Sequence, residues 1–234
     1  MLLLALDTAT AGTSVAIVGE HGGAAVREQF DVLDARRHAE SLPVLVGAAL
    51  DLVGDASIDM VACGVGPGPF TGLRVGIATA LAFGTARDIP VVGACTHDVI
   101  ARTAQNEVPG PVTVLTRARR AELAWASYDA QGRRTQGPLI GREPFRVAGR
   151  CVGDAGPVEA VVHPRAVDLA DLVLERLASG EPLPGDMDLP EAAATDSGSP
   201  AADMLGERVR AGLVLLPPRP IYLRRPDAVA RDDA

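Results

Sequence analysis

The chain has 234 residues, enough for one large domain or two small ones with a well-filled core. Hydrophobic residues make up 47% of it, which excludes a disordered chain, and no apolar run is long enough to span a membrane. The net charge of -8 argues against nucleic-acid binding by this chain alone, so contact with RNA would require a partner that supplies positive charge.

The N-terminal residues lack the basic region and the cleavage site of a signal peptide. The three cysteines, Cys63, Cys95 and Cys151, are dispersed and odd in number, which is typical of reduced, buried thiols rather than of disulfides or zinc ligands. Both features predict a cytoplasmic protein.

The first third of the chain predicts an antiparallel meander followed by a helix. Strands are expected at 2–6, 13–18 and 24–30, with Asp7 at the first bend and Gly22-Gly23 in the second turn. Apolar residues at helical spacing predict a helix from Ala35 to Val53, and Pro43 within it implies a kink or a late helix start.

A Gly/Pro-rich segment from Gly64 to Arg74 separates a buried strand at 60–65 from a helix that should run to Arg87, with Thr71 as its N-cap. This helix has two apolar stripes on nearly opposite sides: Leu73, Ile77 and Ala80 form one, and Val75, Ala78 and Ala82 form the other. Small residues recur every fourth position, at Gly72, Gly76, Ala80 and Gly84. Such a ridge allows another helix to approach closely, in a single large core or in a partner chain.

The Gly64–Arg74 segment does not fit either common phosphate-binding loop. A dinucleotide fingerprint fails because Pro69 or Thr71 stands where the third glycine belongs. A P-loop fails because the chain contains no lysine.

The remaining sequence predicts a strand at 90–94, a helix that begins at Thr96, and then a weak internal repeat. After a linker at 108–111, segments 112–116 and 122–129 restate the opening meander, and a strand at 146–152 and a helix at 166–177 follow. Residues 179–202 have the composition of a flexible loop, and 225–234 that of a polar tail. Three meander strands followed by alternating elements predict an α/β fold with mixed sheets, of the ribonuclease-H-like, actin/Hsp70/sugar-kinase type. We expect a first domain at 1–107 and a shortened second domain at 108–224.

Three stretches carry a resemblance to a known family: Leu4 to Thr10, Gly64 to Arg74, and the closing Pro220 to Arg224. Together they resemble the TsaB (YeaZ-type) subunits of the bacterial tRNA threonylcarbamoyladenosine machinery. The resemblance implies two actin-like domains and a non-catalytic, activating role for a TsaD-type catalytic subunit. It also implies a TsaE-type ATPase in the larger complex, contact with tRNA only through that complex, and pairing through two helices, here 35–53 and 71–87.

The resemblance and the apolar stripes together assign residues to a partner interface. On the first helix these are His38, Leu42, Leu45, Val46 and Ala49; on the second they are Leu73, Arg74, Gly76, Ile77 and Ala80. A homodimer that uses the same helices is expected when the partner is absent.

The Asp7 bend is the candidate nucleotide contact, because actin-like ATPases place a phosphate hairpin there. Asp7 could hold a metal-bound water, while Thr8, Thr10 and Gly12 could meet phosphate. The alternative interpretation is a strand end with turn-forming side chains. The corresponding bend of the repeat carries Arg117, Arg119 and Arg120 in place of a second acidic loop.

An active ATPase or small-molecule kinase is therefore the alternative function of the protein. The favoured interpretation of the Asp7 bend is a vestigial nucleotide contact, with any ATP or ADP bound at the partner interface. No cofactor is required by this chain. A cluster such as Arg117, Arg119 and Arg120 is more often a solvated turn than an RNA-binding site, but it is the best basic patch in this chain for tRNA. His38 lacks a second metal ligand four residues on, where Leu42 stands, and no nucleophile motif supports a peptidase.

Overall fold

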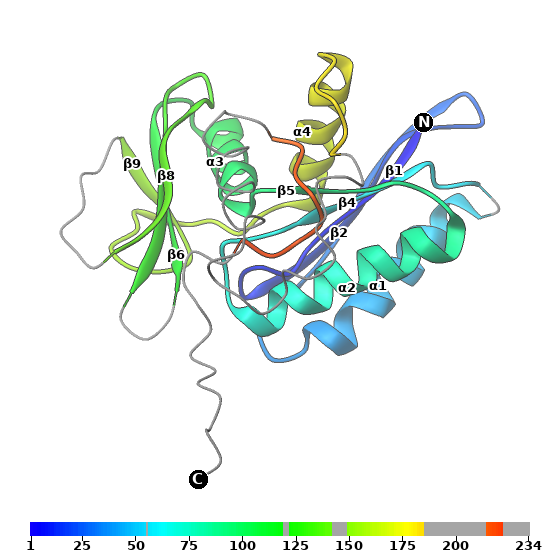
Figure 1. Ribbon diagram of the computed structural model, residues 1–234, viewed down its shortest axis with the longest axis horizontal. Helices are drawn as coiled ribbons and strands as arrows, with labels where there is room; N and C mark the ends of the chain where they lie inside the picture. Colours follow the sequence, from blue (N-terminus) through cyan, green and yellow to red (C-terminus); the bar gives the residue numbers. More distant parts are fainter. Residues whose placement is uncertain (55, 119–121, 142–148, 185–213, 222–234) are drawn as a thin grey trace, which may run out of the picture.

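The computed structural model describes residues 1–54, 56–118, 122–141, 149–184 and 214–221, and these form two five-stranded mixed sheets (Figure 1). The first sheet has the order β3-β2-β1-β4-β5. Its strands are β1 (Leu2–Asp7), β2 (Gly12–His21), β3 (Ala24–Leu33), β4 (Met60–Gly64) and β5 (Val91–Ala94). The meander β1-β2-β3 is antiparallel, whereas β4 and β5 run parallel to β1.

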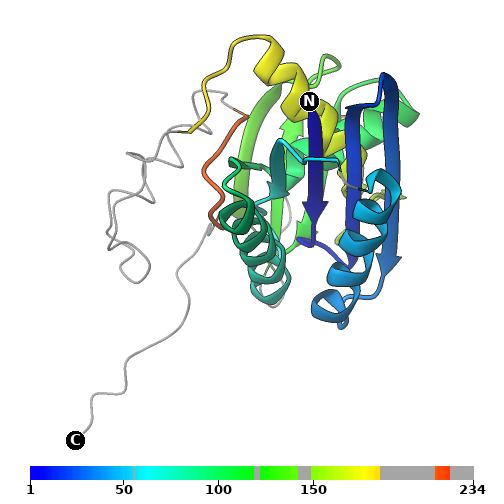
Figure 2. The ribbon, with the colours of Figure 1, turned by 90° about the vertical axis from the view of Figure 1, so that its right-hand side faces the viewer.

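Helices cover both faces of the first sheet, because its central strands are apolar on both sides. Helices α1 (His38–Val53) and α2 (Phe70–Arg87) pack against one face, and α4 (Ala166–Ala178) packs against the other. Figure 2 shows the resulting three layers, with α4 above the strands and α1 and α2 below. Every residue of β1 is buried, as expected for a strand that lies between two helical layers.

The second sheet repeats the topology of the first. Its order is β10-β9-β6-β7-β8, with an antiparallel meander β6-β7-β8 and two strands parallel to β6. The strands are β6 (Val112–Arg117), β7 (Leu123–Tyr128), β8 (Arg134–Gly141), β9 (Arg150–Gly153) and β10 (Ala160–Val161). Within the described residues no helix joins β9 to β10, where the first sheet has α2. The matching sheet orders confirm that the chain has two related halves, as the predicted internal repeat implied.

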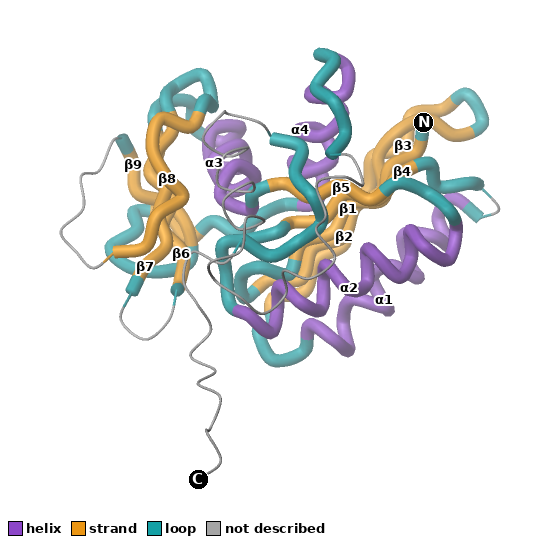
Figure 3. The backbone as a smooth tube through the Cα atoms, in the orientation of Figure 1, coloured by secondary structure: helices purple, strands orange, loops and turns teal. Residues whose placement is uncertain are grey.

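The two halves exchange their last helices. Helix α3 (Thr96–Glu107) follows β5 in the chain, yet Ile100, Ala101 and Ala104 pack on the second sheet. Helix α4 follows β10 and packs on the first sheet. The two helices lie side by side in the middle of the molecule (Figure 3). There Asp168 of α4 accepts hydrogen bonds from Thr103 (2.8 Å) and Asn106 (3.0 Å) of α3. The domain boundary between residues 107 and 108 stays a prediction. Helix α3 precedes it but packs on the second sheet, and α4 follows it but packs on the first.

The C-terminal segment 214–221 covers the β5 edge of the first sheet. Gly93 and Leu216 exchange two backbone hydrogen bonds, and Ile221 donates one to the carbonyl of Val65. Leu215 and Leu216 are fully buried, so this edge is covered rather than open to solvent. Most of the predicted loop, the Tyr222–Arg224 end of the family motif and the predicted tail lie outside the described residues.

Two predicted helix starts are wrong. Helix α1 begins at His38 rather than Ala35, because Asp34 forms a turn with its side chain accepting from the backbone N–H of Arg36 at 3.0 Å. Helix α2 begins at Phe70 with Pro69, not Thr71, as its N-cap. The backbone N–H of Leu73 bonds the carbonyl of Pro69, which places the N-cap two residues earlier than predicted.

Candidate functional site

Asp7 lies at the carboxyl end of β1 and is completely enclosed by the chain's own atoms. Its Oδ1 accepts the backbone N–H of Ala9 at 2.7 Å, and its Oδ2 accepts the hydroxyl of Thr96 at 2.9 Å. Burial raises the pKa of the Asp7 carboxyl to about 6, against the opposing effect of these two hydrogen bonds. Both oxygens are therefore occupied inside the protein, and none faces solvent.

The glycines of the Gly64–Arg74 segment pack directly against the β1–β2 hairpin that contains Asp7. A Cβ at Gly64 would overlap the carboxylate of Asp7, and one at Gly68 would overlap the carbonyl of Ala9. Gly66 donates its N–H to Thr96 Oγ1 at 3.1 Å. The segment thus packs against the hairpin so closely that only glycine fits at these positions. Its physical role in this structure is contact with the Asp7 bend.

The other predicted nucleotide contacts are also engaged internally. Thr8 donates its hydroxyl to the carbonyl of Gly72 at 2.7 Å, at the start of α2. Thr10 is hydrogen-bonded to His163 Nδ1 at 3.1 Å and accepts the N–H of Gly12 at 3.3 Å. Thr8 and Thr10 are buried and Gly12 is half-buried. His163 was not expected here, and no feature of the sequence connects positions 153 residues apart.

The corresponding bend in the second sheet carries a cation. Arg117 ends β6 as Asp7 ends β1, its side chain is exposed, and its backbone N–H bonds Asp154 at 3.3 Å. Arg119 and Arg120 lie outside the described residues. Thr116, one residue earlier, is buried and hydrogen-bonded to His97 Nε2 at 2.7 Å. The described part of the second hairpin thus lacks a carboxylate at the position equivalent to Asp7.

His38 is buried rather than on the surface, which corrects its assignment to an interface or surface position. Its Nδ1 is hydrogen-bonded to the hydroxyl of Thr13 at 2.7 Å. Burial lowers the pKa of its imidazole, so the neutral form is favoured. No group of three His, Cys, Asp or Glu in the described chain could hold a metal ion. The three cysteines are buried, and burial raises the pKa of Cys95 to about 12.

Most of the residues predicted to contact a partner lie in the chain's own core. Those buried under the two helices are Leu42, Val46, Ala49, Leu73, Gly76, Ile77 and Ala80; Leu45 is half-buried and Arg74 is exposed. A Cβ at Gly72 or Gly76 would overlap atoms of Thr8, and one at Gly84 would overlap Val91. The small-residue ridge therefore faces the sheet beneath it. The expectation that it faces a partner is corrected, because the close approach it permits is made by Thr8, directly after β1, and by Val91 of β5.

The second apolar stripe of α2 faces outward. Ala78 and Ala82 are exposed, Val75 is half-buried, and Leu81 beside them is 40% exposed. On the neighbouring α1, Val44 and Leu52 are 68% and 52% exposed. At the start of α2 the guanidinium of Arg74 stacks on the ring of Phe70, 3.9 Å from its centroid. The outward face of the α1–α2 pair, defined by the exposed Val44, Leu52, Phe70, Ala78, Leu81 and Ala82, is thus mostly apolar, with the Arg74 guanidinium at its edge on Phe70. The Val75, Ala78 and Ala82 stripe was its signal in the sequence.

Comparisons with known proteins agree with this architecture. The family model described as "TsaD: tRNA N6-adenosine threonylcarbamoyltransferase" matches residues 32–150. YeaZ from Pseudomonas aeruginosa superposes with a TM-score of 0.66 at 29% identity, covering 77% of this chain and 95% of that one. The TsaB protein of Escherichia coli is 34% identical over 132 residues, or 55% of each chain. An uncharacterized protein of Mycobacterium tuberculosis is 37% identical over 232 residues, covering 97% of this chain and 93% of that one.

Two related sheets, each with a meander followed by parallel strands, define the two-domain α/β fold of the actin, Hsp70 and sugar-kinase superfold. Within that fold the chain belongs to the family that the matching model describes and is a protein of the TsaB (YeaZ) type. None of its described helices is long and apolar enough to cross a membrane.

Proposed function

We propose that this chain is a non-catalytic dimerisation and activating subunit for the N6-threonylcarbamoyladenosine modification of tRNA. It binds a TsaD-type catalytic subunit, works with a TsaE-type ATPase in the larger complex, and meets tRNA only through that complex in the cytoplasm. The names of its relatives, which include the tRNA threonylcarbamoyladenosine biosynthesis protein TsaB of Escherichia coli, support this role. In the absence of the partner, the same surface pairs two copies of the chain.

The observation that carries the proposal is the apolar outward face of the α1–α2 pair. Val44 and Leu52 on α1 and Leu81 on α2 are exposed on two adjacent helices of one layer, and Ala78 and Ala82 of α2 are exposed as well. An exposed apolar patch on a folded domain is typical of a protein–protein contact. Burying it against a partner removes apolar surface from water, which contributes about 25 cal/mol for each Å².

The enclosed Asp7 hairpin supports a non-catalytic role. A working phosphate hairpin must offer its carboxylate to a metal or a water molecule, whereas both oxygens of Asp7 bond to the chain itself. Exposing Asp7 would require the Gly64–Arg74 segment and the start of α2 to move away together. Any ATP or ADP is accordingly assigned to the interface with the partner and not to this hairpin.

The surface is tested by Leu81→Asp, which places a charge on the outward face of the α1–α2 pair. We expect Leu81→Asp to abolish co-elution with the TsaD-type subunit while the Tm of the isolated chain stays within about 2 °C. The matched control is Leu139→Asp, at a residue that is 44% exposed on β8, in the other sheet. This control should bind normally. The proposed surface is wrong if both variants bind the partner equally well.

The non-catalytic role is tested by assaying the purified chain for ATP and peptide hydrolysis. We expect neither rate to exceed the background of buffer. ATP turnover that disappears in Asp7→Ala would overturn the proposal in favour of an active ATPase.

A further inference from the structure

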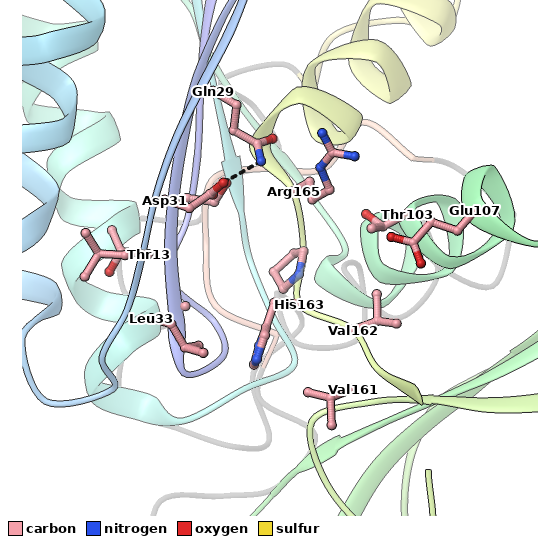
Figure 4. Close-up of a pocket in the computed structure, with 14 residues that line it drawn as sticks. Thr13, Gln29, Asp31, Leu33, Thr103, Glu107, Val161, Val162, His163 and Arg165 are labelled. Atoms are coloured by element: carbon pink, nitrogen blue, oxygen red, sulfur yellow. Dashed lines mark hydrogen bonds between the residues drawn. The ribbon is translucent and has the colours of Figure 1, made fainter. Parts of the chain in front are cut away.

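A cavity of about 270 Å³ lies between the first sheet and helix α3. Its walls come from four separate parts of the chain: the start of β2, the end of β3, helix α3, and the segment 161–165 that leads from β10 into α4. Figure 4 shows Asp31 and Gln29 on one side, Thr103 and Glu107 on the opposite side, and His163 and Arg165 between them. The volume suits a ligand smaller than a typical drug.

Hydrogen bonds fix the walls of this cavity. Ser14 accepts the N–H of Ala166 at 2.8 Å, and Gln29 accepts the N–H of Val167 at 3.1 Å, so the first turn of α4 is tied to β2 and β3. Thr103 donates to Asp168 at 2.8 Å, which ties α3 to α4. The cavity therefore lies between elements that hydrogen bonds already hold together. A ligand would need to order few side chains, which lowers the entropic cost of binding.

Charges of both signs line the cavity without neutralising one another. Arg165 and Glu107 are exposed, and neither forms an ion pair within the described part of the chain. Gln29 donates a hydrogen bond to Asp31 Oδ2 at 2.6 Å, and no described residue bonds the other oxygen of Asp31. Two carboxylates on opposite walls and one guanidinium between them complement a molecule that has both an amine and a carboxylate.

Two apolar side chains also line the cavity. Leu33 at the end of β3 and Val161 on β10 are each 69% exposed, more than any other large hydrophobic residue in the described chain. They lie in the lower part of the cavity as drawn in Figure 4, away from Arg165. A ligand with an apolar side chain would cover them, and burying such surface is favourable.

We propose that this cavity is a binding site for a free α-amino acid with an apolar side chain. Arg165 binds the carboxylate, Glu107 and Asp31 bind the ammonium group, and Leu33 and Val161 contact the side chain. The proposal is independent of the function assigned to the outward face of the α1–α2 pair, which lies on other elements. Charge-assisted hydrogen bonds on both charges make the zwitterion a better ligand than a molecule with either charge alone.

The test titrates the full-length, 15N-labelled chain with L-leucine and follows amide shifts around the cavity by NMR. Two analogues isolate each charge: isoamylamine lacks the carboxylate, and 4-methylpentanoate lacks the amine. We expect saturable shifts of cavity amides with leucine, and a Kd about tenfold or more weaker for either analogue, because each loses one charge-assisted contact. The proposal is overturned if leucine gives no saturable shift at these amides or if an analogue binds as tightly.

Two variants test which side chain binds the carboxylate of leucine and which binds its ammonium group. Arg165→Gln should weaken leucine about tenfold and leave isoamylamine unchanged, and Glu107→Gln should weaken leucine and isoamylamine alike. Arg36→Gln and Glu28→Gln make the same changes at exposed positions that do not line the cavity, and both should bind like the parent. Equal effects of a variant and its control would show that general charge, rather than this cavity, governs binding. A thermal melt of each variant identifies one that has failed to fold, and the other variant then decides.

Discussion

The direction in which the small-residue ridge faces can be tested with a single added methyl group. Gly72 lies in the first turn of α2, and a Cβ there would come closer than 3.0 Å to the backbone carbonyl oxygen of Thr8. A backbone atom cannot rotate away as a side chain can, so Gly72→Ala must push α2 away from the end of β1. Such overpacking typically costs about 1–3 kcal/mol.

Alanine is also the better helix former by up to about 1 kcal/mol, which offsets part of this cost. We therefore expect Gly72→Ala to lower the free energy of unfolding by about 1–2 kcal/mol. For a chain of this size each kcal/mol corresponds to about 2–4 °C in Tm. The matched control is Gly47→Ala in the interior of α1, where a Cβ would meet nothing within 4 Å. The control should raise Tm by about 2–4 °C for the same gain in helix propensity.

The assay is a thermal melt of the isolated chain followed by circular dichroism, with both variants measured beside the parent. Opposite shifts for the two substitutions confirm that the ridge is packed against the chain's own sheet. If Gly72→Ala melts at or above the Tm of the parent, Gly72 is not closely packed against Thr8. The interpretation that the ridge of α2 packs on the chain's own sheet is then wrong. The melt reports packing within the chain and not partner binding, so it is interpretable without the TsaD-type subunit.

Two further predictions concern Asp7 and the loop after α4. Because burial raises the pKa of Asp7 from 3.8 to about 6, the folded state holds its proton more tightly, and ionised Asp7 costs stability as the pH rises through about 6. Asp7→Asn should therefore gain up to about 3 kcal/mol relative to the parent between pH 4 and pH 7.5 in denaturant titrations; a difference independent of pH contradicts this. Replacing residues 185–202 with a short Gly-Ser linker should leave Tm and partner binding unchanged, because Glu181 already bonds the N–H groups of Val214 and Leu215 at 2.7 Å. Loss of folding or of the complex would show that the loop is structural.

Much of the fold could be predicted from local patterns. Apolar runs and turn residues predicted strands at 2–6 and 60–65 and a helix at 166–177, and the structure has each of these elements within a residue or two at either end. The repeat of the meander in the second half was readable as well, because Gln131-Gly132 marks a turn there as Gly22-Gly23 does in the first half. These features depend on residues close together in the chain, so periodicity and turn chemistry were sufficient.

The candidate site could be predicted only in part, because its decisive contacts join distant residues. Asp7 was identifiable as a carboxylate at a strand end, but its burial depends on Thr96, 89 residues away, and on the glycines of the Gly64–Arg74 segment. The cavity beside α3 had no signal at all, since Asp31, Glu107 and Arg165 share no motif.

The sequence alone determined that α2 has two apolar stripes and a ridge of small residues. Only the tertiary structure decided that Leu73, Ile77 and Ala80 lie against the sheet while Ala78 and Ala82 face outward. The physical reason is that a helical period shows which side chains share a face, whereas burial depends on which surface that face meets. Small residues permit close approach by any neighbour, and here the neighbours are Thr8, at the end of the chain's own first strand, and Val91 of β5.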